Sequence, residues 1–321
     1  MPLKTLDLFC GAGGSSAGAR LAGAQIACAI DMSPIATATF KANFPAAKVI
    51  TARLEDVDPT ALRHEIGEID ILLASPECTN HSCAKGAAPR DEASRATAMQ
   101  VVRFARAFEP RWLVLENVVH MRPWARYNEL KVKLKALGYS MAEQILNASD
   151  FGVPQSRRRL FLVGDRNFEP GLVNVVREKK PMKARSILDN RSKWSMTPLF
   201  APSRAKATIG RARRAIGTLG PRTGFLLVYY GTDGSGGWQP LNRPLRTVTT
   251  IDRFALVVRT SQGPKMRMLQ VPELKRAMGF SDAFELPVGT RRERIRLLGN
   301  GVCPPVMRYV VAALVNSPRD R

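Results

Sequence analysis

The sequence contains few of the residues that build metal sites and disulfide frameworks. Its 321 residues include three histidines and five cysteines, and the cysteines stand at positions 10, 28, 78, 83 and 303 without a CxxC pair. Because an odd number of scattered thiols is typical of a protein in a reducing compartment, neither a structural zinc site nor a set of disulfides is indicated. No metal is therefore expected to take part in catalysis.

Long hydrophobic runs are also missing. No apolar run approaches the roughly 20 residues of a membrane-spanning helix, and the first residues lack the apolar stretch of a signal peptide. With 45% hydrophobic and 7% aromatic residues, the chain suits one large or two modest globular domains. The protein is therefore expected to be cytoplasmic and to make no contact with a membrane.

Acidic residues are scarce relative to basic ones. The chain has 49 Lys and Arg against 27 Asp and Glu, which gives a formal net charge of +22. The excess is concentrated between residues 166 and 242, where fourteen basic residues face four acidic ones. A field of this sign attracts polyanions, so nucleic acid is the expected partner, and a basic surface that serves only solubility is the alternative.

The first 165 residues alternate short apolar runs with amphipathic stretches. The pattern predicts strands at 5–9, 25–30, 69–73, 112–115 and 160–163, with helices between them, for instance at 94–108 and 127–137. Apolar strands separated by helices predict an α/β fold with a doubly wound, mostly parallel sheet. Since such sheets bind ligands at the carboxyl ends of their strands, residues 1–165 are the expected catalytic and cofactor-binding domain.

The pattern changes after residue 165. Residues 166–295 break into short pieces rich in proline and glycine, which predicts a smaller, irregular domain of mixed structure. Helical patterns are present at 272–279 and at 302–315, and Leu298-Gly299-Asn300-Gly301 separates them.

A glycine-rich turn follows the first predicted strand. Phe9, Gly11 and Gly13 lie in this turn, and Asp31 ends the next predicted strand. Glycines let backbone N–H groups approach a ligand, and an acidic residue at this place can hold ribose hydroxyls, although a tight connection would look the same. The turn has neither a GxGxxG spacing nor a following Gly-Lys-Ser/Thr, so S-adenosyl-L-methionine fits better than a dinucleotide.

A cysteine in a polar loop follows the predicted strand 69–73. Cys78 stands in the segment Ser75-Pro76-Glu77-Cys78-Thr79. A thiol at the end of a strand can serve as a nucleophile, although free cysteines are more often buried and inert. The neighbouring motifs therefore decide between the two interpretations.

Short blocks occur in a fixed order along the chain: Phe9-x-Gly11-x-Gly13, Asp31-Met32-Ser33-Pro34, Asp56-Val57, Cys78, Glu116-Asn117-Val118, the segment from Asn147 to Arg159, Arg243-Pro244-x-x-Thr247, and Gly299-Asn300-Gly301-Val302. Together they resemble the DNA (cytosine-5)-methyltransferase family of prokaryotic or phage type. The resemblance spans nearly the whole chain. It implies the S-adenosylmethionine-dependent methyltransferase fold, with residues 166–295 as a DNA-recognition domain and 296–321 returning to the catalytic domain.

The resemblance also implies a role for each matching residue. Cys78 would attack C6 of a flipped-out cytosine, Glu116 would bind N3 and the exocyclic amine, Arg159 would hold O2, and Arg157 would stabilise the thiolate. The implied cofactor-binding residues are Phe9, Gly11, Gly13, Asp31, Met32, Asp56 and Asn300. The implied substrate-loop residues are Glu77, Ser82, Asn117 and Gln155.

The partners implied by the resemblance are double-stranded DNA and, in a restriction-modification system, a restriction endonuclease. A monomeric enzyme in a bacterial or phage-infected cell is expected. A tRNA cytosine-5 methyltransferase on the same fold is the alternative, as is a DNA-binding relative with lost activity or a modified methyl donor.

The chain departs from the family beside its nucleophile. Glu77 stands directly before Cys78, where the family has proline, and Thr79 and His81 replace a glutamine and an aromatic residue. A carboxylate beside a thiol disfavours the thiolate. We therefore expect Glu77 to point away from Cys78 or to be neutralised by an arginine such as Arg157.

Overall fold

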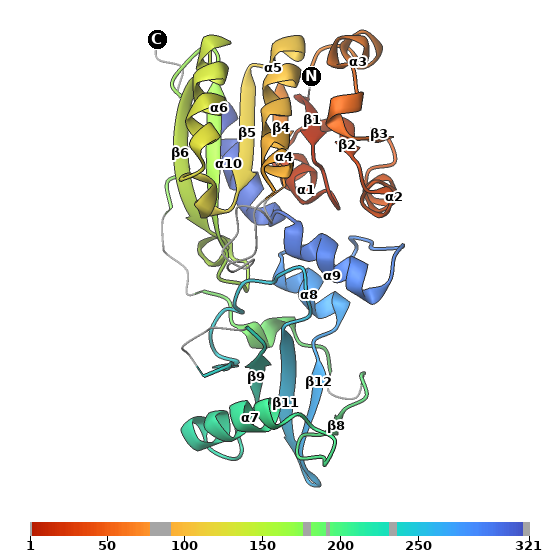
Figure 1. Cartoon of the computed structure of the whole chain (residues 1–321), viewed down its shortest axis with the longest axis vertical. Coiled ribbons are helices and arrows are strands. Elements are labelled where there is room, and N and C mark those ends of the chain that lie inside the picture. Colours follow the sequence, from red (N-terminus) through yellow and green to blue (C-terminus); the bar gives the residue numbers. More distant parts are fainter. Residues whose placement is uncertain (1, 78–90, 176–180, 191–192, 231–235, 317–321) are drawn as a thin grey trace.

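The computed structural model describes residues 2–77, 91–175, 181–190, 193–230 and 236–316. Figure 1 shows two parts stacked along the long axis of the molecule. The larger part contains a seven-stranded sheet, and the smaller part contains a five-stranded sheet with one helix beside it. Helices α8 (Val271–Ala277) and α9 (Arg291–Asn300) lie between the two parts.

The seven-stranded sheet has the strand order β3-β2-β1-β4-β5-β7-β6. All neighbouring pairs are parallel except those that involve β7, which is antiparallel to both β5 and β6. The strands are β1 (Lys4–Leu8), β2 (Gln25–Asp31), β3 (Lys48–Thr51), β4 (Ile71–Ala74), β5 (Trp112–Asn117), β6 (Ser140–Asn147) and β7 (Arg158–Asp165). The prediction of a doubly wound, mostly parallel sheet is confirmed, and β3 and β6 are strands that the sequence pattern did not indicate.

Helices cover both faces of this sheet, as the fully buried strands β4 and β5 require. One face packs against α3 (Pro59–Ile66), α5 (Gln100–Phe108) and α6 (Ala125–Ala136). The other packs against α1 (Gly14–Leu21) and α10 (Pro304–Val315), and α2 (Pro34–Asn43) lies beside β2 and β3. The core thus forms two layers, one on each side of the sheet.

The contact between α1 and α10 depends on glycine. A Cβ atom on Gly14 would lie 2.2 Å from the carbonyl oxygen of Val302, and one on Gly18 would lie 2.5 Å from Cβ of Met307. Only a residue without a side chain allows the two backbones to approach so closely. The last helix therefore packs against the first one, while the division of the chain at residues 165 and 295 stays a prediction.

The smaller part is more regular than the sequence pattern suggested. Its antiparallel sheet has the order β10-β9-β11-β12-β8, and α7 (Lys206–Leu219) packs on it through Ala212 and Ala215. The strands are β8 (Thr197–Pro198), β9 (Phe225–Val228), β10 (Trp238–Pro240), β11 (Phe254–Thr260) and β12 (Gly263–Met268). Alternate residues of β9 and β11 supply the small core beneath α7.

Two helix predictions need correction. The stretch 94–108 is not one helix: α4 (Glu92–Ala96) and a 3-10 turn (Thr97–Met99) precede α5. The segment 298–301 was expected to lie between helices, but Leu298, Gly299 and Asn300 form the last turn of α9. The capping box of Thr290 and Glu293 begins this helix, a signal that the sequence carried.

The stretch Arg291–Val315, which contains α9 and α10, is long and apolar enough to cross a membrane by length and composition alone. However, 56% of its apolar window is buried inside the protein, as is usual for helices of a protein core. In the described part of the chain, no three His, Cys, Asp or Glu side chains gather as a metal site would need.

Candidate active site

The glycine-rich turn after β1 is held by Asp31 at the end of β2. The N–H of Gly11 donates to Oδ2 of Asp31 at 2.9 Å, and the N–H of Ser33 donates to Oδ1 at 2.9 Å. Burial raises the pKa of Asp31, and these two hydrogen bonds oppose that shift. Phe9 and Gly11 both have positive φ, 57° and 52°, so the backbone turns sharply between β1 and α1.

One side of this turn is packed and the other is open. A Cβ on Gly13 would lie 2.7 Å from the ring of Phe44, whereas a Cβ on Gly11 would meet no atom within 4 Å. Beside the open side, Asp31 ends β2, and Met32, which follows it, is 66% exposed. The residues fit a nucleoside cofactor with a sulfonium group. They offer the carboxylate of Asp31, the accessible backbone of Gly11 and the apolar side chain of Met32, and they include no cation that would bind a phosphate.

Two other predicted cofactor residues have exposed side chains. Asp56 ends a 3-10 turn (Leu54–Asp56), and Asn300 ends α9. The close contact between Gly14 and Val302 brings the segment after Asn300 to the start of α1. Asn300 thus belongs to a segment that lies against the glycine-rich turn, although the two are far apart in the sequence.

A buried carboxylate lies at the carboxyl end of β5. Oε1 of Glu116 is 3.2 Å from Nε of Arg159, which stands near the start of the antiparallel strand β7. This oxygen is buried and lacks a well-oriented hydrogen bond. Burial raises the pKa of Glu116, and the guanidinium groups of Arg159 and Arg157 oppose the rise. A carboxyl group poised in this way can hold a proton against a ligand.

The paired arginines differ in what they contact. Arg157 is 2% exposed, and its guanidinium donates to the carbonyl oxygens of Val248 at 3.0 Å, Gly299 at 2.8 Å and Gly301 at 2.9 Å. Gly299 itself packs so closely that a Cβ would lie 2.3 Å from the carbonyl carbon of Thr249. Arg157 therefore joins the start of β7 to the segment that carries Asn300, whereas Arg159 faces Glu116.

The segment before Cys78 is fixed from two directions. Nδ2 of Asn117, at the end of β5, donates to the carbonyl oxygen of Pro76 at 3.1 Å. The hydroxyl of Ser94 in α4 donates to Oε2 of Glu77 at 3.1 Å. Cys78 and Ser82, together with Thr79 and His81, lie outside the described residues. The Ser94 contact agrees with the hypothesis that the Glu77 carboxylate points away from the thiol, which stays a hypothesis.

The helix α4 that carries Ser94 is itself anchored. The carboxylate of Glu92 accepts from Nε1 of Trp124 at 2.8 Å and from Arg95 at 3.1 Å. Trp124 follows β5 and is buried. Glu77 is thereby connected through α4 to the segment after the strand that ends in Glu116 and Asn117.

Gln155 does not reach a surface. Its side chain is 0% exposed, Nε2 donates to the carbonyl oxygen of Ala277 at 2.9 Å, and Oε1 accepts from the N–H of Val248 at 2.7 Å. The position was expected to belong to the substrate loop. In the structure, Gln155 instead links the segment before β7 to α8 and to the strand-like segment after Leu245.

Two residues near this site were missed in the sequence. Cys303, at the start of α10, is buried, and its pKa is raised to about 11 by burial while Arg157 and Arg159 oppose the shift. Asp7 is buried in β1, accepts from the Ser16 hydroxyl at 2.6 Å, and has its pKa raised to about 7 by burial. Cys303 follows directly on the Gly299 block, and Asp7 precedes the glycine-rich turn by two residues, so both were next to recognised motifs.

The sequence matches the family described as C-5 cytosine-specific DNA methylase over residues 3–316. The chain belongs to this family. It is 36% identical over 169 residues to the Type II methyltransferase M.AgeI of Thalassovita gelatinovora, which covers 50% of this chain and 39% of the relative. The first curated relatives are thus matched over about two fifths of their own length.

Other family members match from end to end. The Type II methyltransferase M.NgoPII of Neisseria gonorrhoeae is 24% identical over 356 residues, which cover 100% of this chain and 97% of the relative. The solved structure of the methyltransferase EhMeth from Entamoeba histolytica superposes with a TM-score of 0.72 at 15% identity and covers all of both chains. The chain therefore has a methyltransferase fold, as expected.

Proposed function

We propose that this protein transfers a methyl group from S-adenosylmethionine to C5 of a cytosine in a short double-stranded DNA sequence. The observation that carries the proposal is the pair of Glu116 and Arg159: Glu116 is buried at the carboxyl end of β5, and its Oε1 lies 3.2 Å from Nε of Arg159. The same sheet edge carries the open glycine-rich turn and the Asn117 contact that fixes Pro76, two residues before Cys78.

The cofactor would be held by the turn between β1 and α1. Asp31 would bind the ribose hydroxyls, and Phe9 and Met32 would contact the adenine base. Gly11 and Gly13 would let the backbone approach the cofactor closely. Asp56 and Asn300 would line the edge of the cofactor site. When bound, S-adenosylmethionine supplies an electrophilic methyl group. The residues of the chain supply the rest of the chemistry.

Cytosine C5 is too weak a nucleophile to accept a methyl group unaided, so the ring must first be activated. The thiolate of Cys78 adds to C6, which moves electron density to C5, while the carboxyl of Glu116 holds a proton at N3. The raised pKa of Glu116 favours the protonated form that this hydrogen bond needs. After C5 accepts the methyl group, a base removes the C5 proton and Cys78 leaves by β-elimination.

The two arginines would serve this step in different ways. Arg159 would hold O2 of the cytosine while keeping its contact with Glu116, so that base and carboxyl stay aligned. Arg157, with its three bonds to backbone carbonyls, would act as a positioning residue for the segment that carries Asn300.

Glu77 would position the nucleophile in place of the family's proline. A proline restricts the backbone through its ring, whereas Glu77 is tied to α4 by the hydroxyl of Ser94. This contact also directs the carboxylate to a hydrogen-bond donor, which lowers its repulsion of the Cys78 thiolate.

Residues 166–295 would read double-stranded DNA after the target base is flipped out. Helix α7 supports this role with Lys206, Arg211, Arg213 and Arg214 and no acidic residue. We further propose that the enzyme acts as a monomer on DNA inside a bacterial or phage-infected cell, paired with a restriction endonuclease.

The proposal is tested with labelled S-adenosylmethionine and three substrates: duplex DNA, single-stranded DNA and tRNA. Transfer to duplex DNA, located by bisulfite sequencing, is expected, and a covalent adduct with 5-fluorocytosine DNA should disappear in Cys78→Ala. Transfer to tRNA alone would make the protein a tRNA methyltransferase. DNA binding without transfer to any substrate would refute the proposed activity.

A further inference from the structure

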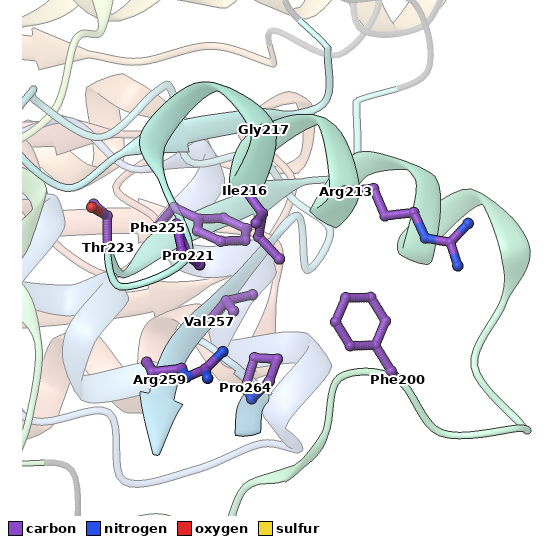
Figure 2. Close-up of a pocket in the computed structure, with 10 residues that line it drawn as sticks. All are labelled: Phe200, Arg213, Ile216, Gly217, Pro221, Thr223, Phe225, Val257, Arg259 and Pro264. Carbon is purple, nitrogen blue, oxygen red and sulfur yellow. The ribbon is translucent and has the colours of Figure 1, made fainter. Parts of the chain in front are cut away.

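A pocket of about 380 Å³ lies in the smaller part of the molecule, between α7 and the antiparallel sheet. Figure 2 shows its lining, which comes from α7, from the turn after α7, from β9, β11 and β12, and from Phe200. Figure 1 shows α7 at the opposite end of the molecule from the seven-stranded sheet, whose strand β5 carries Glu116. The pocket is therefore separate from the proposed active site.

The pocket has an apolar floor and one exposed aromatic wall. Phe225 and Val257 are buried beneath it, and Ile216 of α7 and Pro264 of β12 complete the apolar surface. Phe200 lies at the edge of the pocket and is 46% exposed. Because the large Phe200 ring is partly exposed to solvent beside an apolar pocket, a flat apolar ligand that covers the ring is favoured.

Two guanidinium groups flank this apolar surface. Arg213 of α7 and Arg259 of β11 line the pocket, and within the described ranges neither guanidinium group makes a hydrogen bond, an ion pair or a ring contact. No acidic side chain lines the pocket. In the view of Figure 2, Arg213 lies on the same side as Phe200, and Arg259 lies beside Pro264.

The neighbouring arginines of α7 make a useful contrast. Arg211 lies over the ring of Tyr229 at 5.4 Å, and Arg214 donates to the carbonyl oxygen of Gly236 at 3.1 Å. These two side chains support the fold of the smaller part. Arg213 has no such partner in the described part of the chain, so its charge is available to a ligand.

We propose that this pocket binds one unstacked nucleotide of single-stranded DNA, with its base against Phe200 and the apolar floor and its phosphates beside Arg213 and Arg259. Bases stack on aromatic side chains and phosphates pair with guanidinium groups, which matches this lining. A base in a duplex has both faces covered by its neighbours and cannot enter. The choice of DNA over other phosphate esters rests on the proposed function. The assignment of the pocket as a binding site for a base and its phosphates does not depend on that function.

The test is the affinity for a fluorescein-labelled 12-nucleotide oligothymidylate, followed by anisotropy with the full chain. Excess unlabelled duplex is present throughout, so that the duplex-binding surface is occupied. Phe200→Ala is expected to weaken binding about tenfold, as the loss of one stacked base does. Arg213→Ala combined with Arg259→Ala should reduce the slope of log affinity against log salt by about 1.4, since each single-strand phosphate contact contributes about 0.7.

Arg222→Ala is the matched control, because Arg222 is exposed just after α7 and does not line the pocket. It should bind the oligonucleotide within twofold of the unchanged protein. If Arg222→Ala weakens binding as much as the pocket variants, the effect is one of bulk charge and the proposal is wrong. It is equally wrong if Phe200→Ala binds as tightly as the unchanged protein.

A second aromatic variant covers the case in which Phe200→Ala fails to fold. Phe200→Leu keeps an apolar side chain but removes the stacking face, so it should weaken binding while its thermal midpoint stays unchanged. Methylation of duplex DNA is measured in parallel. If neither the unchanged protein nor the variants methylate DNA, but binding of oligothymidylate still requires Phe200, the proposed function is wrong and the assignment of the pocket is supported.

Discussion

Substitution of Arg157 by methionine tests the difference between the paired arginines. Methionine is of similar length and apolar, so Arg157→Met removes the donors without leaving a large cavity. Three carbonyl oxygens, those of Val248, Gly299 and Gly301, lose the guanidinium that now bonds them. The substitution therefore isolates the contribution of these hydrogen bonds.

The magnitude follows from the number of acceptors left without a partner. A buried acceptor that loses its donor destabilises a protein by about 1–3 kcal/mol. With three acceptors and some entry of water, the free energy of unfolding should fall by about 3–6 kcal/mol. That is a large share of the roughly 5–15 kcal/mol that stabilises a folded domain.

Arg159→Met is the matched comparison. It removes the guanidinium 3.2 Å from Glu116, but the carboxyl of Glu116, whose pKa burial already raises, can take up a proton. Arg159→Met should therefore lose less stability than Arg157→Met. It should also abolish methyl transfer while it leaves the affinity for S-adenosylmethionine unchanged.

Urea denaturation measures the first difference and titration calorimetry with S-adenosylmethionine measures the second. Arg157→Met should bind the cofactor more weakly, because Gly299 and Gly301 flank Asn300. Equal losses of stability in the two variants would refute the structural role of Arg157. So would an Arg157→Met protein within about 1 kcal/mol of the unchanged protein.

Three further predictions concern positions near the site. Burial raises the pKa of Asp7 from 3.8 to about 7, so the folded state binds this proton more tightly than the unfolded state does. The contribution of Asp7 to stability is then greatest below about pH 4 and falls by about 4 kcal/mol as the pH rises to about 7. Asp7→Asn should remove this contribution, so the free energies of unfolding of the two proteins, measured with urea between pH 4 and 8, should differ by an amount that changes with pH. Gly14→Ala would place a Cβ 2.2 Å from the carbonyl oxygen of Val302, so it should lower the thermal midpoint by several degrees. In α7, a Cβ on Gly217 would have no atom within 4 Å, so Gly217→Ala should leave the thermal midpoint unchanged or raise it. Glu77→Ala and Ser94→Ala should each reduce kcat, and the double variant should reduce it no further, because the Ser94 hydroxyl and the Glu77 carboxylate form a single hydrogen bond. Additive reductions in kcat would contradict a role for this hydrogen bond.

The sheet could be predicted where its strands are buried on both faces. β4 and β5 are fully buried and begin with apolar runs, and their bounds were predicted to within two residues. β3 has four residues and β6 is half-buried along almost its whole length, so neither produces a clear apolar run or alternation. The strands that were missed are the two edge strands of the sheet.

The site could be predicted as a set of motifs but not as a set of contacts. Asp31, Glu116 and Arg159 lie where their motifs indicated, at strand ends of one sheet. The burial of Gln155 and the bonds of Arg157 depend on segments more than 90 residues further along the chain. No local pattern contains that information, because it arises only when α8, α9 and the segment around Val248 fold back.

The glycine contact between α1 and α10 has a consequence for how the chain matures on the ribosome. Gly14 begins α1 beside the glycine-rich turn, and its backbone lies against Val302, which is far along the chain from it. Contacts of such high sequence separation form late in folding. While the chain is being synthesised, the apolar face of the sheet beneath α1 stays partly uncovered and needs protection from aggregation. The segment that carries Val302 must therefore be synthesised before this face of the sheet is covered.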